Sequence, residues 1–134
     1  MKNLYKLKNI VFNYDNNYFI NDLNLEIFRS EITSFVGPNG SGKTTLLNIL
    51  SFLNFPHSGS IFFNNIELKK NNIKIFRNKV GYVQQNPYLF RGTVYKNIEI
   101  GLKLNNVNFE KRVCKIEKVL SLLKIEHLIN RLAN

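Results

Sequence analysis

The sequence predicts an α/β fold, and three observations support that prediction. First, apolar residues alternate along residues 4–14 and 18–28, as they do in strands that bury one face. Second, residues 44–53 and 109–123 repeat apolar side chains at the spacing of an α-helix. Third, the glycine-rich segment 37–44 lies between a β-rich run and the first of these helices. At 134 residues, the chain has the size of one domain at most.

In chain order, the first elements are a strand, a turn and a second strand. The sequence Asp-Asn-Asn at 15–17 is a turn signal between the two alternating runs. A short β-rich run at 32–36 predicts a third strand, which leads into the glycine-rich segment. The helix over 44–53 has a broad apolar face, and Pro56 and Gly59 predict where it stops.

The remaining elements are shorter until the last helix. Residues 60–63 predict a strand, and the Asn-Asn pair at 64–65 predicts a hairpin turn after it. The sequence VGYVQ at 80–84 predicts another short strand. In the helix over 109–123, charged side chains lie opposite the apolar positions, so we expect one face to pack on the protein and the other to meet solvent.

The chain is strongly basic. It has 19 Lys and Arg against 9 Asp and Glu, which gives a net charge of +10. Such an excess is typical of proteins that bind nucleic acid or anionic membranes. However, the chain also contains 22 Asn, 14 Lys and 14 Ile, whose codons are all A/T-rich, and the lysines are scattered. We therefore favour genome composition as the explanation and expect no nucleic-acid partner.

Cysteine usage and hydropathy exclude further classes. Cys114 is the only cysteine of the sequence, which excludes an intramolecular disulfide framework and a Cys-based zinc site. No apolar run approaches the roughly 18 residues of a bilayer span. Lys6, Lys8 and Asn9 interrupt any signal-peptide core near the N-terminus. These observations favour a soluble protein in a reducing compartment.

The glycine-rich segment fits the pattern G-x-x-x-x-G-K-[ST] of a phosphate-binding loop. Its glycines let the backbone curl until successive N–H groups point into one cavity, which phosphate oxygens fill. The lysine adds positive charge, the threonine hydroxyl can ligate Mg²⁺, and the following helix directs the positive end of its dipole at the anion. The alternative is a glycine-rich turn with an exposed lysine. The residues of the segment are Gly37, Pro38, Asn39, Gly40, Ser41, Gly42, Lys43 and Thr44.

This segment and its surroundings resemble the ATP-binding domain of ATP-binding-cassette (ABC) ATPases, the motor subunits of ABC transporters. The Walker A sequence GPNGSGKTTLLNIL carries the resemblance, and PHSGSIFFNN, VGYVQQNPYLF and TVYKNI follow it in the family's order. The resemblance implies a P-loop NTPase (RecA-like) core with an N-terminal antiparallel β subdomain in residues 1–86 and the start of a helical subdomain in residues 87–134. The family's signature motif, Walker B strand and switch histidine do not follow, so we expect an incomplete domain.

The resemblance implies a nucleotide site made of Tyr14 and residues 37–45, with ATP and Mg²⁺ as cofactors. Tyr14 stands 23 positions before Gly37, where the family has an aromatic residue that stacks on adenine. From the residues alone, a strand-end tyrosine that packs on the surface is the favoured interpretation. Lys43 faces the β- and γ-phosphates, and Thr45 bonds the α-phosphate.

The resemblance also implies how Mg²⁺ and the attacking water are held. Gln85 matches the family's Q-loop glutamine, which ligates Mg²⁺ or holds the water, and Gln84 is the alternative register. Thr44 is the other implied Mg²⁺ ligand, and Lys43 and Gln85 are the implied catalytic residues. One position departs from the family: Ser30 stands where glycine is usual, which predicts a strained or differently shaped turn.

The function implied is that of an ATP-binding subunit that couples ATP binding and hydrolysis to solute transport across a membrane, as in importers. The implied partners are a second ATP-binding subunit in a head-to-tail dimer, transmembrane permease subunits and a solute-binding protein. The implied location is cytoplasmic, on the inner face of the cell membrane. Two alternatives stay open: an ABC ATPase of translation or DNA repair, and a nucleotide-binding remnant without activity. We expect the chain alone to bind Mg-nucleotide weakly and not to hydrolyse it.

Overall fold

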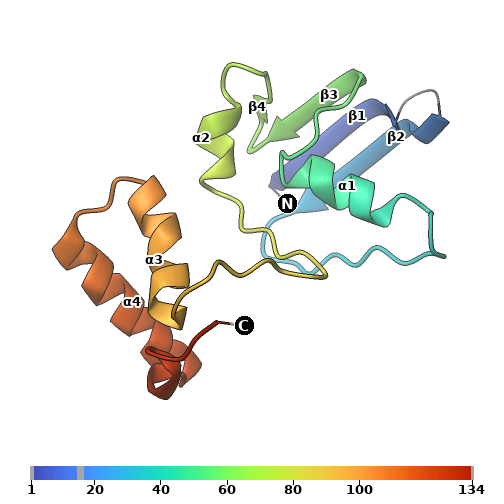
Figure 1. The fold of residues 1–134 in the computed structure, drawn as a ribbon. Coiled ribbons are helices and arrows are strands. Elements are labelled where there is room, and N and C mark those ends of the chain that lie inside the picture. The colour runs from blue at the N-terminus through green and yellow to red at the C-terminus, as the bar shows by residue number, and fades with distance from the viewer. Residues whose placement is uncertain (1, 15–16, 134) are drawn as a thin grey trace. The chain divides into compact units, whose positions relative to one another are not determined.

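The computed structural model describes residues 2–14 and 17–133. The chain forms two compact units, Met1–Tyr82 and Val83–Asn134 (Figure 1), and each is described by itself. The predicted turn at 15–17 includes Asp15 and Asn16, which lie outside the described residues. Within the described part of the chain, no helix combines the length and the apolar character needed to cross a bilayer.

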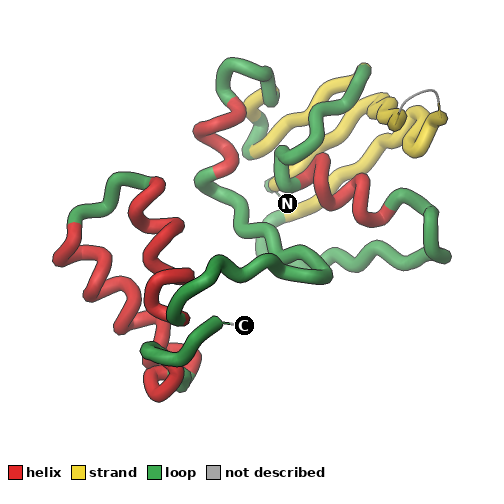
Figure 2. The backbone as a smooth tube through the Cα atoms, in the orientation of Figure 1, coloured by secondary structure: helices red, strands yellow, loops and turns green. Residues whose placement is uncertain are grey.

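The first unit contains a four-stranded antiparallel sheet, drawn in yellow in Figure 2. Its strands are β1 (Asn3–Tyr14), β2 (Asn17–Phe28), β3 (Ser58–Phe63) and β4 (Ile66–Glu67). They lie side by side in the order β2-β1-β3-β4, so that β1 pairs with both β2 and β3. The predicted strands at 4–14, 18–28 and 60–63 are confirmed, and so is the antiparallel character of the N-terminal sheet.

Two turns of this unit use backbone angles that were expected from the sequence. Asn64 and Asn65, between β3 and β4, have φ of 52° and 63°. Positive φ at both central residues is the geometry of the two-residue hairpin turn, which asparagine tolerates better than most residues. Ser30 has φ of 62°, so the turn after β2 does hold a serine in the left-handed region that glycine occupies at lower cost.

Helix α1 (Lys43–Leu50) packs on one face of the sheet and forms the core with it (Figure 1). Ile49 on the helix and Ile10 on β1 are both fully buried. The hydroxyl of Tyr5 donates a hydrogen bond of 2.8 Å to the carbonyl oxygen of Leu50, and burial raises the pKa of Tyr5 to about 12. The helix predicted over 44–53 is therefore confirmed, with an end at Leu50.

A short helix that the sequence pattern did not indicate closes the core of the first unit. It is α2 (Ile73–Arg77), and its buried Phe76 packs against the rings of Phe52 and Phe63 at centroid distances of 6.0 and 5.7 Å. The Arg77 guanidinium donates hydrogen bonds of 3.0 and 2.8 Å to the carbonyl oxygen of Phe52. With five residues, α2 is too short for periodicity to show, and its tertiary contacts hold it.

The strands predicted at 32–36 and 80–84 are wrong, because the structure has no strand at either place within its described residues. Ile32 and Val36 are 97% and 96% exposed, and Val83 is 86% exposed. A β-rich run becomes a strand only where a neighbouring strand pairs with its N–H and C=O groups. The sheet order β2-β1-β3-β4 includes neither run.

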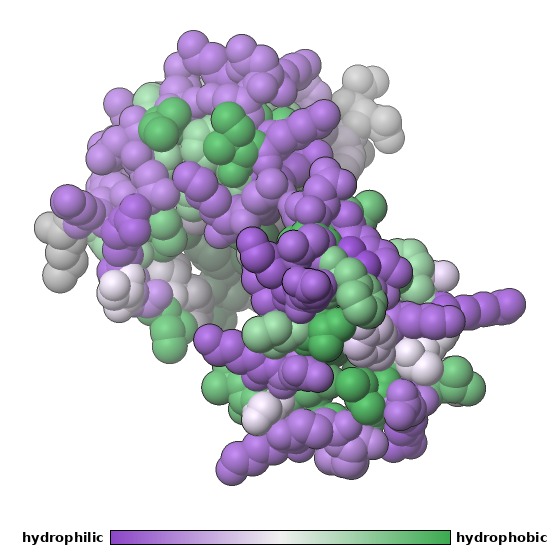
Figure 3. Space-filling model, turned by 90° about the vertical axis from the view of Figure 1, so that its left-hand side faces the viewer, coloured by the Kyte–Doolittle hydropathy of each residue, from purple (hydrophilic) through white to green (hydrophobic). Residues whose placement is uncertain are grey.

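The second unit is helical. It contains α3 (Val94–Leu104), α4 (Phe109–Leu123) and a short 3-10 helix, η1 (Glu126–Leu128). Helix α4 confirms the amphipathic helix predicted over 109–123, and its buried residues are Ile116 and Leu120. Helix α3 was not predicted. On the face shown in Figure 3, apolar side chains lie at the surface among hydrophilic ones.

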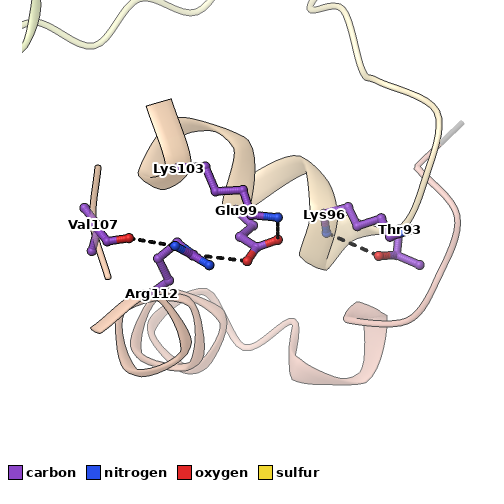
Figure 4. A network of polar contacts seen from close by, with 6 residues as sticks. All are labelled: Thr93, Lys96, Glu99, Lys103, Val107 and Arg112. Atoms are coloured by element: carbon purple, nitrogen blue, oxygen red, sulfur yellow. Dashed lines mark hydrogen bonds and ion pairs between the residues drawn. The ribbon is translucent and has the colours of Figure 1, made fainter. Parts of the chain in front are cut away.

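A buried carboxylate joins the two long helices of this unit (Figure 4). Glu99 on α3 is 6% exposed, and its two oxygens lie 2.7 Å from Nζ of Lys103 and 3.1 Å from Nε of Arg112 on α4. Arg112 also donates to the carbonyl oxygen of Val107 at 2.7 Å. The hydrogen bond from Lys103 is the main reason why the pKa of Glu99 lies below its ordinary value, and Arg112 lowers it further.

Candidate functional site

The loop before α1 has the backbone geometry of an anion-binding concavity. Gly40 and Gly42 have φ of 83° and 85°, a left-handed conformation in which most side chains are strained. The amide of Ser41 donates to the carbonyl oxygen of Pro38 at 3.3 Å, which tightens the loop. Alternation of left-handed and ordinary residues turns successive N–H groups toward the same side, and this arrangement binds anions.

The N-terminus of α1 differs from those of the other two long helices. Thr93 accepts a hydrogen bond from the amide of Lys96 at the start of α3, and Asn108 accepts one from the amide of Lys111 at the start of α4. The N-cap of α1 is Gly42, which has no side chain to do this, and the first turn of α1 has no acidic residue. The amides of its first turn therefore lack a side-chain cap and can bind a phosphate group.

The ammonium group of Lys43 lies within the loop. Its Nζ donates to the carbonyl oxygens of Gly37 and Pro38 at 2.8 and 2.6 Å, and lies 3.4 Å from Oγ of Ser41. These contacts hold a positive charge beside the loop amides and the helix N-terminus. Three sources of positive potential thus act on one place, which favours a polyanion there.

The two threonines that follow Lys43 have different surroundings. The side chain of Thr44 is exposed, whereas Thr45 is 7% exposed and lies among the buried residues of α1. An exposed hydroxyl beside the uncapped amides of α1 is accessible to a cation. The Thr44 side chain therefore fits the metal role better than that of Thr45, and the contact predicted from Thr45 to the α-phosphate stays a prediction.

A cavity of about 620 Å³ adjoins the loop. Its walls come from β2, from residues 34–38, from the loop residues Ser41 to Lys43 and from Leu46 on α1. Phe19 and Ile20 supply its apolar side, and Lys43 supplies charge. Small-molecule sites have volumes of about 300–1,000 Å³ and combine apolar walls with a few polar groups. The cavity has room for a nucleotide-sized ligand.

Tyr14 lies at the end of β1 and is 43% exposed. Its ring makes an edge contact with the ring of Phe19, with centroids 5.1 Å apart. Phe19 lines the cavity, and its carbonyl oxygen lies 3.4 Å from the point that a Cβ of Gly42 would occupy. The structure thus links Tyr14 through one residue to the loop. Phe19 itself was missed, because aromatic residues are frequent in this region of the sequence.

Gln85 is exposed and belongs to the second unit, as does the alternative, Gln84. Its predicted place beside the nucleotide stays a prediction. Within residues 2–14 and 17–133, no group of three or more His, Cys, Asp or Glu side chains could hold a metal ion.

Comparison with known proteins identifies the family of the chain. The family model described as "ABC transporter" matches residues 20–134. The energy-coupling factor transporter ATP-binding protein EcfA of Aster yellows witches'-broom phytoplasma is 40% identical over 130 residues, which cover 96% of this chain and 48% of EcfA. The chain spans about half the length of the curated relatives that it matches.

Two solved structures share the fold. CbiO1 from Clostridium perfringens, part of the ABC transporter complex CbiONQ, superposes with a TM-score of 0.82 at 27% identity over 98% of this chain and 55% of CbiO1. A dimeric ATP-binding cassette in a post-hydrolysis state, bound to ADP and Pi, superposes with a TM-score of 0.78 at 30% identity over 97% of this chain and 62% of that cassette. The resemblance given by the Walker A segment is confirmed: the chain belongs to the ABC transporter family, as a partial nucleotide-binding domain.

Proposed function

We propose that this chain binds ATP with Mg²⁺ as the phosphate-binding half of an ATP-binding subunit of an ABC transporter. The observation that carries the proposal is the arrangement at the start of α1: an uncapped helix N-terminus, a loop with two left-handed glycines, and the Lys43 ammonium held within that loop. Among the three long helices that the structure describes, α3 and α4 are capped by side chains, so α1 has the N-terminus suited to an anion.

Each candidate site residue has a role in this proposal. The amides of residues 37–45 would hold the phosphates, and Lys43 would offset charge on the β- and γ-phosphates. Tyr14 would stack on the base, which a π-face does without demanding a particular hydrogen-bond pattern. Gln85 would ligate Mg²⁺ or hold the attacking water.

The groups present fit Mg²⁺. This cation usually keeps several water ligands and is held by substrate phosphates with one or two protein groups, so an acidic cluster is not required. The exposed hydroxyl of Thr44 lies next to the amides that would bind the phosphates. When held there by Thr44 and Gln85, Mg²⁺ would supply positive charge that neutralises part of the phosphate charge.

The whole protein would couple ATP binding and hydrolysis to solute transport. EcfA is named as a transporter ATP-binding protein, CbiO1 is part of a transporter complex, and the solved ATP-binding cassette is dimeric, which supports a second ATP-binding subunit and permease subunits as partners. We further propose import as the direction, a solute-binding protein as an additional partner, and a cytoplasmic position on the inner face of the membrane. In this proposal, residues 1–86 hold the nucleotide and residues 87–134 begin the helical subdomain.

Titration calorimetry of the 134-residue chain with ATP tests the proposal. We expect Lys43→Ala to weaken binding by about tenfold or more, because a charge-assisted contact to phosphate is worth about 1.5–3 kcal/mol. Lys74→Ala, at an exposed position on α2, is the matched control and should leave the affinity unchanged. Equal affinity of the Lys43→Ala variant and the unaltered chain would refute the phosphate-binding role of the loop.

A further inference from the structure

A hydrogen bond connects Tyr14 to the far end of the helix that follows the loop. The side-chain amide of Asn54 donates to the hydroxyl oxygen of Tyr14 at 2.9 Å, although the two residues are 40 positions apart. Asn54 follows α1, whose other end carries Lys43 and the loop. One helix therefore connects the proposed phosphate site to the residue that contacts Tyr14.

The backbone around Asn54 is firmly held. The amides of Leu53 and Asn54 both donate to the carbonyl oxygen of Asn48, at 2.9 and 3.1 Å. Phe52 has φ of 60° and is completely buried in the core, so the chain leaves the helix in one defined direction. Asn54 is thus presented to Tyr14 by an anchored turn rather than by a freely moving loop.

The ring of Tyr14 is held from three sides. Phe12 and Phe19 make edge contacts with it, at centroid distances of 4.9 and 5.1 Å and interplanar angles of 81° and 84°. The third contact is the bond from Asn54 to the hydroxyl. Although the side chain is 43% exposed, its orientation is thereby restricted, and an aromatic residue that is already oriented loses less rotational freedom when a ligand stacks on it.

We propose that Asn54 is a positioning residue, which holds the Tyr14 ring in the orientation that stacks on the base of a bound nucleotide. The inference rests on the proposed function, because it assumes that nucleotide binds at the loop. It adds a residue that neither motif spacing nor the pattern of the strands indicates. It also assigns a task to the turn after α1, so that the phosphate contact lies at one end of this helix and the residue that positions Tyr14 follows the other.

Binding of ATP and of inorganic tripolyphosphate to the 134-residue chain tests this role, because only ATP has a base. We expect Asn54→Leu to weaken ATP about threefold, because the released ring loses more rotational freedom when it stacks on the base, and to leave tripolyphosphate unchanged. Asn71→Leu, the same substitution in an exposed turn, is the matched control. Tyr14→Phe removes the same bond from the other side and should have the same effect even if Asn54→Leu disturbs the fold.

The double variant, Asn54→Leu with Tyr14→Phe, completes the cycle. We expect it to bind ATP no more weakly than either single variant, because both changes remove one bond. Additive losses, an unchanged affinity for ATP in both single variants, or an equal loss for ATP and tripolyphosphate would each overturn the positioning role. The Lys43→Ala variant separates this failure from that of the proposed function, since it should weaken both ligands whatever Asn54 does.

Discussion

Two β-rich segments of the first unit differ in structure: one is a paired, buried strand and the other lies outside the sheet. Strand β3 pairs with β1 on one side and β4 on the other, and its Ile61 and Phe63 are 2% and 4% exposed. The run at 32–36 has a similar local preference, yet it lies outside the sheet with Ile32 and Val36 almost fully exposed. Both segments belong to the same compact unit.

The difference between the two segments is the presence of a pairing partner. Strand β1 has two edges, and β2 and β3 occupy them. Within the part of the chain that the structure describes, β2 and β4 form the outer edges of the sheet, and residues 32–36 pair with neither of them. The preference of a residue for strands therefore does not act alone, because it reflects packing against cross-strand neighbours. Only Phe35 of this run packs partly against the core.

The largest expected effect comes from truncating one isoleucine to alanine in each segment. We expect Ile61→Ala to lower the free energy of unfolding by about 2–5 kcal/mol, because it leaves a cavity in the core. Ile32→Ala should change it by no more than about 0.5 kcal/mol, since that side chain is exposed. Urea denaturation of both variants measures the difference. A comparable loss from Ile32→Ala would show that residues 32–36 are packed in solution.

A second pair of substitutions tests the backbone. Gly59 in β3 has φ of +93°, and an added Cβ would lie 2.5 Å from the carbonyl oxygens of Lys8 and Asn9. We expect Gly59→Ala to cost about 1–3 kcal/mol or more, because the paired strand cannot move away. Gly81 has no heavy atom of the described chain within 4 Å of such a Cβ.

The same substitution at Gly81 should therefore not lower the stability of the fold. Gly81→Ala lies in the run at 80–84, which forms no strand in the described chain, and we expect it to be neutral or to stabilise by up to about 1 kcal/mol by restricting the unfolded chain. Thermal denaturation compares the two variants directly. A strong loss of stability from Gly81→Ala would mean that this run is held in a sheet.

In the second unit, the buried, ion-paired carboxylate of Glu99 can be compared with the exposed side chain of Glu117. Lys103 and Arg112 lower the pKa of Glu99, so the folded state holds this carboxylate charged more firmly than the unfolded state does. Its contribution is present above the ordinary pKa and is lost as the pH falls through the lowered, folded-state pKa. We expect helicity to become less stable to heat between pH 5 and about pH 3, where carboxylates titrate.

Substitution isolates the contribution of this residue. Glu99→Gln should reduce the thermal stability at pH 7 and flatten its dependence on pH, because the charge between α3 and α4 is removed. Glu117→Gln, at an exposed position on α4, should change neither. Circular dichroism of the two variants at both pH values measures this. An unaltered pH dependence in Glu99→Gln would contradict the role of the ion pair.

The sequence predicted the elements whose stability is local or whose partners lie nearby. The alternation of β1 and β2, the periodicity of α4 and the Asn64-Asn65 turn all appear in the structure as expected. Helix α3 was missed because β-branched residues and Gly101 weaken its local signal, and its ion pair with α4 becomes visible only after folding. The strands at 32–36 and 80–84 were predicted from preference without knowledge of partners.

The candidate site likewise has a part that the sequence predicts and a part that becomes visible only in the structure. Spacing alone located the loop, because a phosphate-binding loop of this type has glycines and a lysine in a fixed order. The bond from Asn54 to Tyr14 joins residues on different elements 40 positions apart, and no local pattern indicates it. The absence of a side-chain cap on α1 likewise becomes informative only beside the caps of α3 and α4.

Site-resolved hydrogen exchange of the 134-residue chain, with and without ATP, tests the central claim most directly. We predict slow exchange over 58–63 under both conditions, fast exchange over 32–36 without ATP, and new protection of the amides at 40–45 when ATP is added. Protection of 32–36 equal to that of 58–63 without ATP would contradict the contrast between paired and unpaired segments. Unchanged exchange at 40–45 with saturating ATP would contradict the nucleotide site itself.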